Sequence, residues 1–461
     1  MKQARKWAAA DPHVVKDWIQ ENQSINQDLR VQGAALRARA RDLEQNNDYV
    51  SKWLALCEIN TVPIRLQSKV RTTRGKLDTR INRLIERGFS RWHRKETCSL
   101  DGRLNWQEVQ RLVIRSVARD GEVIVRFVPG DTLKLAIYDA DWLDENYNQV
   151  KNDRRPAIMQ SIEVDAMGKP VAYYLSEPSS SPVFGSPQRR SYERVPASEI
   201  LHIYKPERPN QIRGSTWMAS VMIHLLMLHR YERAEMAAAE FSAKKIGFYK
   251  TPTGDWLDDQ TEGDYGLPNS IQGLGMTELP VGVDMDLIDP SHPVSAYEQY
   301  VKAVLRGIAT GLGVTYHALS GDLTSVSFSS IRSGTIEERD RWRSIQNWLI
   351  EALHRPVFER WLAENLTSLG LQASDFDRAS EAHFQARGWQ WVDPVKELQS
   401  QQMAYAMGIE SLSGIAAQFG KDLEEVFDQR QKESELAESY GVEINLLNFT
   451  EEPPVENTED G

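Results

Sequence analysis

The sequence predicts an α+β protein in which a mostly antiparallel sheet region is followed by long amphipathic helices. Runs rich in β-branched and aromatic residues gather between residues 109 and 206 and are separated by Gly, Pro and Asp turns. From residue 215 onward, apolar residues recur at spacings of three and four, which is the period of an amphipathic helix. The 461 residues suffice for about two to four domains, because a single core stops growing near roughly 250 to 300 residues.

The composition is that of a globular protein, with 41% hydrophobic and 26% charged residues. Cys57 and Cys98, the two cysteines, cannot form a disulfide framework and lack the paired spacing of a zinc site. The N-terminus has no apolar core of a secretory signal, and no apolar run approaches the roughly 18 residues of a membrane span. We therefore expect a folded protein of a reducing compartment with no membrane partner.

The charge is negative overall and unevenly distributed. Lys and Arg number 55 against 66 Asp and Glu, for a formal net charge of −11. Residues 1–100 carry 20 basic and 11 acidic side chains, whereas residues 251–300 carry ten acidic and no basic ones. The net sign is wrong for tight binding to DNA phosphates, which depends on the release of counterions by basic side chains. An acidic block can also serve solubility alone.

The first half of the chain is predicted to contain an N-terminal helical arm and then the sheet region. Residues 1–95 form the arm, and residues 96–217 form the α+β region, opened by a helix at 106–119. Strands are expected at 122–128 and 133–143, and a hairpin with Gly168 at its tip follows. The order of these elements predicts an antiparallel sheet packed with helices.

The second half is predicted to be mainly helical. A long helix over 215–245 and another over 294–313 bracket a region of short strands and turns, residues 246–293, which holds the acidic block. A loop at 314–332 precedes a helix over 331–366 that Pro356 must kink or break. Two or three helices follow between 395 and 438. The acidic residues 441–461 are expected to form a disordered tail.

The chain carries little that points to catalysis. It has no phosphate-binding GxxxxGK[ST] loop, so ATP hydrolysis is not expected. Asp139, Asp141 and Asp144, in the segment YDADWLDE, are the best candidates for a two-metal nuclease. The same residues suit a strand end and turn, where Asp is favoured for local hydrogen bonds. We prefer the turn and expect no enzyme activity, no catalytic residue, no metal and no cofactor; the nuclease stays an alternative.

The loop at 314–332 is unusually polar for a simple connection. Its ionisable side chains are His317, Asp322 and Arg332. It also has many neutral hydroxyl groups, those of Ser320, Thr324, Ser325, Ser327, Ser329 and Ser330. Neutral hydroxyls can contact a phosphate backbone without releasing counterions, and so without holding it tightly. A functional loop is therefore favoured over a mere connector.

Five segments together resemble the lambda family of phage portal proteins, in order and in spacing, over roughly residues 40–440. They are RSVARDGEVIVRF, DADWLD, IEVDAMGKPVAYYL, RVPASEILHIYKPERPNQIRGSTWMASVM and the stretch from Ser295 to Arg332. Within them, KPERPNQIRG and LRGIATGLGVTYHALSGD are the most specific motifs. The resemblance implies the portal fold, assembled as a ring, most often a dodecamer, around a central channel.

The resemblance also assigns a part of the portal fold to each region. Residues 96–217 would be the α/β wing, and 218–245 and 294–313 the two paired stem helices. The acidic segment 246–293 would be the small clip insertion, and 314–332 the tunnel loop. Residues 333–392 would be a long kinked helix that returns to the wing, and 393–440 the helical crown.

The function that the resemblance implies is that of a channel at one capsid vertex, through which double-stranded DNA is packaged and ejected. The implied partners are the terminase motor, then head-completion, adaptor and tail proteins, and the major capsid and scaffold proteins. The protein would be part of the virion and would be assembled in the bacterial host cytoplasm. A structural adaptor ring that conducts no DNA is a second alternative.

Two sets of site residues follow from the resemblance. Weak, non-specific contacts with DNA are expected from loop residues and from basic residues on the paired helices. These are His317, Ser320, Thr324, Ser325, Ser327, Ser329, Lys244, Lys245, Lys302 and Arg306. Docking of partner proteins is expected at the carboxylates of the clip, namely Asp255, Asp258, Asp259, Glu262 and Asp264.

Overall fold

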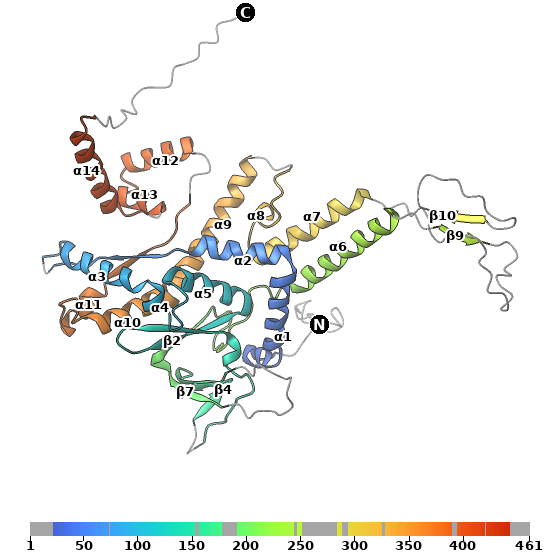
Figure 1. Ribbon diagram of the computed structural model, residues 1–461, viewed down its shortest axis with the longest axis horizontal. Helices are drawn as coiled ribbons and strands as arrows, with labels where there is room; N and C mark the ends of the chain where they lie inside the picture. Colours follow the sequence, from blue (N-terminus) through green and yellow to red (C-terminus); the bar gives the residue numbers. More distant parts are fainter. Residues whose placement is uncertain are drawn as a thin grey trace, which may run out of the picture. The chain divides into compact units, whose positions relative to one another are not determined.

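The computed structural model describes residues 22–72, 74–152, 156–177, 191–243, 247–250, 284–287, 294–324, 328–389, 394–419 and 421–442. The chain divides into two compact units. The sheet unit comprises Met1–Glu44, Val50–Trp217 and Ser325–Gly461, and the helix-pair unit comprises Gln45–Tyr49 and Met218–Thr324. Figure 1 labels their elements in chain order. Within the described ranges, no helix combines the length and the apolar character needed to cross a bilayer.

Two antiparallel sheets form the centre of the sheet unit, as the sequence predicts. One has the strand order β3-β2-β8 and the other β4-β5-β6-β7. The strands are β2 (Glu122–Val128), β3 (Lys134–Tyr138), β4 (Ala157–Met159), β5 (Ile162–Val164), β6 (Pro170–Leu175), β7 (Glu193–Pro196) and β8 (Ile200–Tyr204). The hairpin between β5 and β6 turns at Gly168, whose φ of 82° favours glycine. The α+β class is therefore confirmed, and β2 has the predicted bounds.

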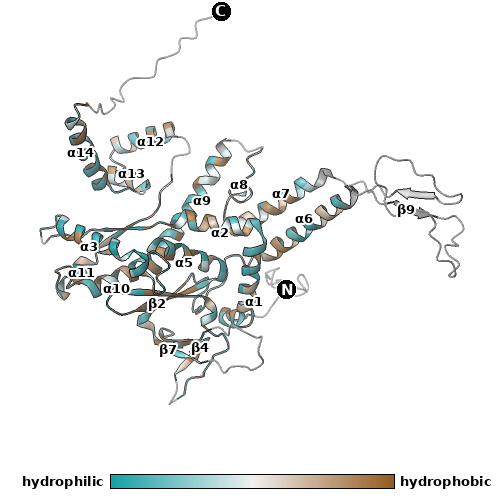
Figure 2. Ribbon diagram, in the orientation of Figure 1, coloured by the Kyte–Doolittle hydropathy of each residue, from teal (hydrophilic) through white to brown (hydrophobic). Residues whose placement is uncertain are grey.

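The apolar residues of the two sheets meet in one buried cluster. Its members come from β2, β5, β6, β7 and β8 and from the 3₁₀ turn after β3. They are Ile124, Leu143, Ile162, Val164, Tyr173, Leu175, Val195 and Ile200. Figure 2 shows the hydrophobic residues concentrated along β2. Short 3₁₀ turns connect the strands at Ala140–Trp142 and Ala197–Glu199. Removal of this apolar surface from water is the main force that joins the two sheets.

The helix α5 (Trp106–Asp120) packs against β2 and has well-defined ends. At its start, the Asn105 side chain accepts from the Glu108 amide and the Glu108 side chain accepts from the Asn105 amide, which is a capping box. Its buried face includes Val113 and Val117. It ends at Gly121, which has a φ of 95°. The predicted helix at 106–119 and the turn after it are thus present.

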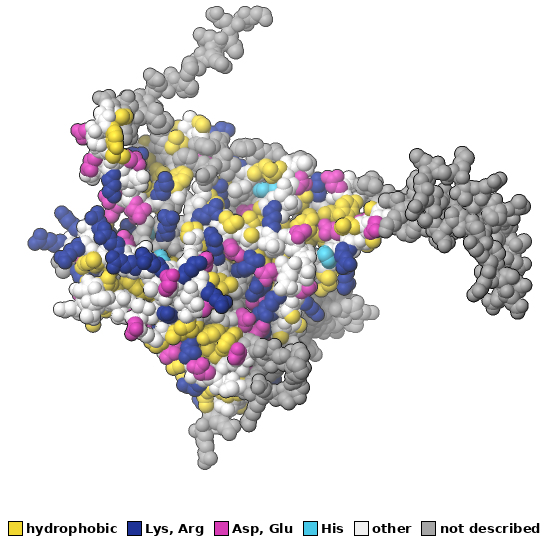
Figure 3. Space-filling view, in the orientation of Figure 1, with side chains coloured by type: hydrophobic (Ala, Val, Ile, Leu, Met, Phe, Trp, Pro, Cys, Tyr) yellow, Lys and Arg dark blue, Asp and Glu magenta, His cyan; other side chains and the backbone are white. Residues whose placement is uncertain are grey.

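The described part of the N-terminal arm is mainly helical, but it also contains a strand that the sequence did not predict. Its described elements are α1 (Ile25–Asn46), α2 (Asp48–Thr61), β1 (Arg65–Ser68), α3 (Thr79–Trp92) and α4 (Lys95–Cys98). The strand β1 pairs antiparallel with β11 (Ala382–Gln385), so that Leu66 lies opposite Phe384. A four-residue strand whose partner is so distant in sequence leaves no period in the local pattern. Basic side chains gather around α3 (Figure 3).

The helix predicted over 331–366 is interrupted, as Pro356 requires. It consists of α9 (Phe328–Leu349), a π-helical turn at Ile350–His354 and α10 (Arg355–Asn365). Pro356 lies in the first turn of α10, where a missing backbone N–H costs nothing. After it come a 3₁₀ turn at Ala373–Asp375 and α11 (Phe376–Ala379). Three further helices complete the described chain, α12 (Pro394–Ala406), α13 (Leu412–Gln418) and α14 (Leu423–Ser439).

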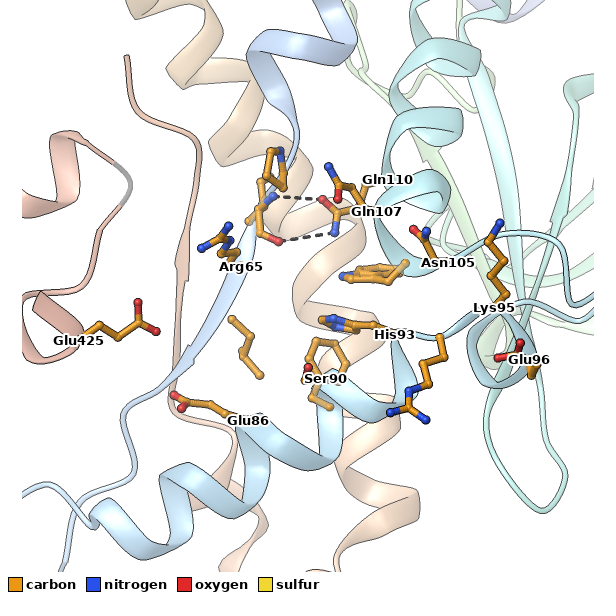
Figure 4. A pocket seen from close by; sticks show the side chains of 16 residues that line it. Arg65, Glu86, Ser90, His93, Lys95, Glu96, Asn105, Gln107, Gln110 and Glu425 are labelled. Carbon is orange, nitrogen blue, oxygen red and sulfur yellow. Dashed lines mark hydrogen bonds between the residues drawn. The ribbon is translucent and has the colours of Figure 1, made fainter. Parts of the chain in front are cut away.

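An aromatic cluster holds α3, α5, α10 and β11 together. Phe89 lies edge-on to Phe358 and Trp361, with ring centroids 5.5 and 5.1 Å away. Two histidines belong to it. His354 is 5.3 Å from Trp106, and His93 stacks on the same indole at 6.2 Å. A cavity of about 810 Å³ lies beside His93 (Figure 4).

His354 is buried and His93 is half-buried, and Nε2 of each is a buried atom without a hydrogen-bond partner among the described residues. Burial lowers the pKa of His93 to about 4 and that of His354 to about 3, from an ordinary value of 6.5. The folded protein therefore keeps both imidazoles neutral at pH 6, whereas an unfolded chain takes up protons there. Stability is present above pH 6.5 and is lost as the pH falls.

We predict that lowering the pH from 7 to 5 reduces the free energy of unfolding by roughly 2 kcal/mol for each histidine. Urea unfolding followed by tryptophan fluorescence measures this loss. The double variant His93→Phe, His354→Phe should lose much less stability over the same pH range. An equal loss in wild type and double variant would contradict the assignment.

Candidate functional site

The helix-pair unit holds most of the residues that the sequence predicts to contact DNA. Its core consists of α6 (Met222–Ala243) and α7 (Val294–Leu312), which pack through Leu225, Leu228, Leu305, Ile308 and Leu312. Val221, directly before α6, lies so close to α7 that a Cβ atom on Gly311 would lie 2.3 Å from its Cγ1 atom. A small residue is therefore required at position 311.

The first of these helices starts later than the sequence predicts. The expected start was residue 215, whereas α6 begins at Met222. Residues before it are tied to the end of α5, since the Trp217 amide donates to the Ala118 carbonyl at 3.2 Å. Beyond α6, two short antiparallel strands, β9 (Gly247–Lys250) and β10 (Asp284–Leu287), lie within the predicted strand-and-turn region.

The polar loop predicted over 314–332 is shorter and more ordered than expected. Residues Tyr316–Ser320 form the helix α8, and α9 already begins at Phe328. Leu319 anchors α8 because its side chain is fully buried. The helix ends at Gly321, whose φ is 78°. A single apolar anchor in a polar segment is too weak a pattern to predict a helix from sequence.

Asp322 organises the residues after α8. Its carboxylate accepts hydrogen bonds from the Thr324 amide at 2.9 Å, the Thr324 hydroxyl and the Tyr316 hydroxyl at 3.0 Å. The ammonium of Lys302, on α7, lies 3.2 Å away. The hydrogen bonds from Thr324 and then from Lys302 and Tyr316 hold the pKa of Asp322 below its usual range. We call this arrangement the Asp322 clasp.

Lys302 and Arg306, which the sequence treats alike, differ in the structure. Lys302 faces the Glu298 carboxylate at 2.7 Å and Asp322 at 3.2 Å, so its charge is compensated within the chain. These two partners raise the pKa of Lys302. Arg306 is exposed, and its guanidinium carbon lies 5.6 Å from the centre of the Tyr316 ring. Among the described residues, no carboxylate lies within 4.0 Å of Arg306.

The described hydroxyl and imidazole groups of the loop make internal hydrogen bonds. Nε2 of His317 lies 3.2 Å from the Thr315 hydroxyl. The Ser320 hydroxyl donates to the Tyr316 carbonyl at 2.8 Å and accepts from the Asp322 amide at 3.1 Å. Thr324 is exposed and donates to Asp322. These hydrogen bonds order the described part of the loop. They also leave fewer hydroxyl groups available to a ligand than the composition suggests.

The remaining predicted site residues lie in α9 or outside the described residues. Ser329 belongs to the first turn of α9. Ser325, Ser327, Lys244 and Lys245 lie outside the described residues. So do the predicted docking carboxylates Asp255, Asp258, Asp259, Glu262 and Asp264.

The carboxylates of the nuclease alternative are engaged in local structure. Asp141 accepts from Arg37 at 3.1 Å and from Arg41 at 2.5 Å. Burial would raise the pKa of Asp141, but the two arginines outweigh it and hold that pKa low. Asp139 caps a 3₁₀ turn through the Asp141 amide, and Asp144 accepts from the Tyr192 hydroxyl at 2.7 Å. In the described part of the chain, no group of three His, Cys, Asp or Glu residues is arranged to hold a metal.

A buried ion pair that sequence reasoning missed joins Arg213 of the KPERPNQIRG motif to the start of β2. Glu122, at the start of β2, is fully buried and accepts from Arg213 at 2.7 Å, from the Gly214 amide at 2.8 Å and from His202 at 2.9 Å. Burial would raise the pKa of Glu122, but the charge of Arg213 and the hydrogen bond from His202 lower it. Arg213 also donates to the carbonyls of Leu143 and Ala140 at 3.2 and 3.1 Å.

Two glycines allow this ion pair to form. A Cβ atom on Gly214 would lie 2.1 Å from the Gly121 carbonyl oxygen, and one on Gly121 would lie 2.4 Å from the Ser215 backbone. The two backbone segments therefore cross in contact, with the Glu122 carboxylate beside the crossing. This Glu122–Arg213 crossing fixes the segment that leads into α6.

We predict that Asp322→Asn loosens the clasp, because Lys302 and the Thr324 and Tyr316 donors lose a charged acceptor. Amide hydrogen exchange of residues 315–324 should become roughly tenfold faster. The matched control is Asp340→Asn, which removes the same charge from an exposed pair with Arg343. Unchanged exchange in Asp322→Asn would show that the clasp does not order the loop.

Comparison with known proteins gives a consistent result. Residues 13–346 match the family model of the phage portal protein, lambda family. A probable portal protein of Halomonas phage phiHAP-1 is 32% identical, over 92% of this chain and 86% of that protein. Portal protein B of Escherichia phage lambda is 21% identical, over 91% and 87% of the two chains. Among solved structures, a chain from the neck of a native gene transfer agent particle is similar with a TM-score of 0.46 at 15% identity, over 83% of this chain and 91% of that chain.

Proposed function

Because the chain belongs to the lambda family of phage portal proteins, as its sequence motifs predict, we propose that its copies form a ring-shaped DNA channel at one capsid vertex. Double-stranded DNA enters and leaves the capsid through this channel. Residues 96–217 form the wing, α6 and α7 are the paired stem helices, and residues 314–332, which include α8, form the tunnel loop. Residues 393–440 form the crown.

The observation that carries this proposal is the two-sided apolar character of the stem helices. One side of α6 and α7 is buried in their shared core, yet Ile223 and Met227, four residues apart on α6, are more than half exposed. Exposed apolar neighbours on one face of a helix mark an interaction surface. A second copy that covers them makes a head-to-tail contact, and such contacts close into a ring when the rotation allows.

The crown helices support the same assembly. In α12, α13 and α14 no described side chain is buried, although Val395, Met403, Phe427 and Leu436 are apolar and exposed. Three helices without a core of their own gain stability when they pack against neighbouring copies. The dodecamer stays the expected ring size.

Within the channel, we assign the DNA contacts to Arg306 and to the exposed hydroxyl side of the tunnel loop. We also propose weak DNA contacts for the other predicted residues, namely His317, Ser320, Thr324, Ser325, Ser327, Ser329, Lys244 and Lys245. Lys302 instead holds the loop through Asp322. A channel with few free basic groups in a chain of net charge −11 lets DNA slide, because few counterions are released at any position.

The acidic segment 246–293 serves as the clip, where the terminase docks during packaging and head-completion, adaptor and tail proteins dock afterwards. Its carboxylates steer a basic partner to this edge. Major capsid and scaffold proteins contact the rest of the ring, so that the protein is part of the virion.

Electron microscopy of the purified full-length protein tests the ring. We expect closed rings with a central hole wide enough for a DNA duplex. Rings with a closed centre would support the adaptor alternative, and monomers at every concentration would contradict the proposal.

A second experiment tests the division of roles between Arg306 and Lys302. Arg306→Glu should reduce the amount of DNA that particles package and retain severalfold, since it places a like charge against the phosphates. Arg306→Lys should package normally, and so should the control Arg343→Glu in the sheet unit. Normal packaging by Arg306→Glu would remove this residue from the channel contacts.

A further inference from the structure

The strongest feature that the proposed channel does not use is a row of arginines along α3. Arg80, Arg83, Arg87 and Arg91 follow each other at spacings of three and four, and Arg94 comes directly after the helix. All five side chains are exposed. At about 100° and 1.5 Å per residue, the four on α3 occupy one face over roughly 17 Å. Lys and Arg side chains crowd this part of the molecule in Figure 3. We call it the α3 arginine row.

These arginines differ from others in the sheet unit because they are not compensated. Arg37, Arg41, Arg115, Arg119 and Arg213 all contact carboxylates at 3.1 Å or closer. Within the described residues, Arg80, Arg87, Arg91 and Arg94 have no carboxylate within 4.0 Å. Arg83 lies 3.5 Å from Asp428 of α14, and both side chains are more than half exposed. A chain of net charge −11 thus keeps positive charge unpaired here.

The helix that carries the row is rigidly held from behind. Asp78 caps it by accepting from the Ile81 amide at 3.1 Å. Asn82 exchanges hydrogen bonds with the Val70 backbone at 2.9 and 3.2 Å. Ile85 is fully buried, and the Trp92 indole donates to the Leu133 carbonyl at 2.6 Å. The row therefore has a fixed orientation, and binding of a ligand does not include the entropic cost of ordering the helix.

The chemistry of the row suits a linear polyanion better than a folded protein partner. Stable protein interfaces centre on aromatic and aliphatic anchors, and Leu84 is the one large apolar side chain that α3 exposes among its arginines. Guanidinium groups bind phosphate with two hydrogen bonds each. A DNA duplex presents one negative charge per roughly 1.7 Å of its axis, so that about ten charges pass along a 17 Å row.

We propose that the α3 arginine row binds the phosphate backbone of double-stranded DNA, independently of sequence. This goes beyond the proposed channel, since the row belongs to the sheet unit and each copy carries it whether or not a ring forms. The contact is tighter than the weak one assigned to Arg306, because several unpaired arginines act together. Arg71, Arg74 and Lys76, exposed just before α3, extend the basic surface.

The structure also shows what opposes this binding. Asp428 and Glu435 of α14 line a hollow together with Arg83 and Arg87. Their carboxylates repel phosphate and occupy the Arg83 end of the row, so that DNA binds most strongly towards Arg91 and Arg94. Removing the charge of Asp428 should consequently strengthen DNA binding, an effect that a misfolded variant would not produce.

The test is fluorescence anisotropy of a labelled duplex of about 30 base pairs with the full-length protein, at several salt concentrations. The triple variant Arg87→Gln, Arg91→Gln, Arg94→Gln should bind at least about tenfold more weakly at 50 mM salt. Its slope of log affinity against log salt should fall by about 2 to 3, near 0.9 per lost phosphate contact. Asp428→Asn should bind more tightly than wild type.

The matched control is Arg355→Gln, Arg360→Gln, Arg378→Gln, which removes the same charge from arginines that pair with Glu351, Glu364 and Asp375. This control should keep nearly all of the affinity. Equal affinity and salt slope in wild type and the α3 variant would overturn the proposal. So would binding of a poly-glutamate peptide to the row without binding of the duplex, which would identify an acidic protein as its partner. Ring formation by the α3 variant, seen by microscopy, keeps this outcome separate from the proposed function.

Discussion

The buried contact between Glu122 and Arg213 is the constraint on which the rest of the sheet unit depends. Two ions without access to water are unfavourable unless their geometry and remaining hydrogen bonds are complete, and loss of one partner costs about 3 to 5 kcal/mol. Here His202 and the Gly214 amide donate the remaining hydrogen bonds to the Glu122 carboxylate. The carbonyls of Ala140 and Leu143 accept hydrogen bonds from the Arg213 guanidinium. Those carbonyls belong to the turn that offers Asp141 to Arg37 and Arg41 of α1. One ion pair thus connects a strand, a turn and the route into α6.

Sequence patterns predicted the helices and strands that are specified by residues close together in the chain. The strand Glu122–Val128 and the Gly168 hairpin follow from β-branched runs and turn residues, and the long helices α6 and α7 follow from apolar spacing. The strand β1 and the helix α8 were missed because each has four or five residues. Their stability comes from partners elsewhere: Leu66 is held opposite Phe384, and Leu319 is buried by tertiary packing. Such contacts leave no period in the sequence.

In the candidate site, the sequence likewise did not predict which charged side chains form ion pairs. Composition identified the polar loop and its nearby basic residues, but it could not tell Lys302 from Arg306. The difference arises because Lys302 meets an aspartate twenty positions later, and only the folded chain brings them to 3.2 Å. The arginines of α3 recur at helical spacing in the sequence, but we predicted no role for them from it. Whether an arginine forms an ion pair, as Arg115 and Arg213 do, depends on the positions of the carboxylates in the folded chain. The sequence does not show these positions.

The pairing of β1 with β11 has a consequence for how each copy is made. A ribosome must add about 300 residues between the two strands, which takes roughly 15 to 60 s at 5 to 20 residues per second. During that time β1 exposes an unsatisfied edge, and the aromatic cluster lacks Phe358, Trp361 and Phe384. The nascent sheet unit therefore cannot close until most of the chain has left the ribosome. Translation itself therefore sets the earliest moment at which a copy can complete its sheet unit.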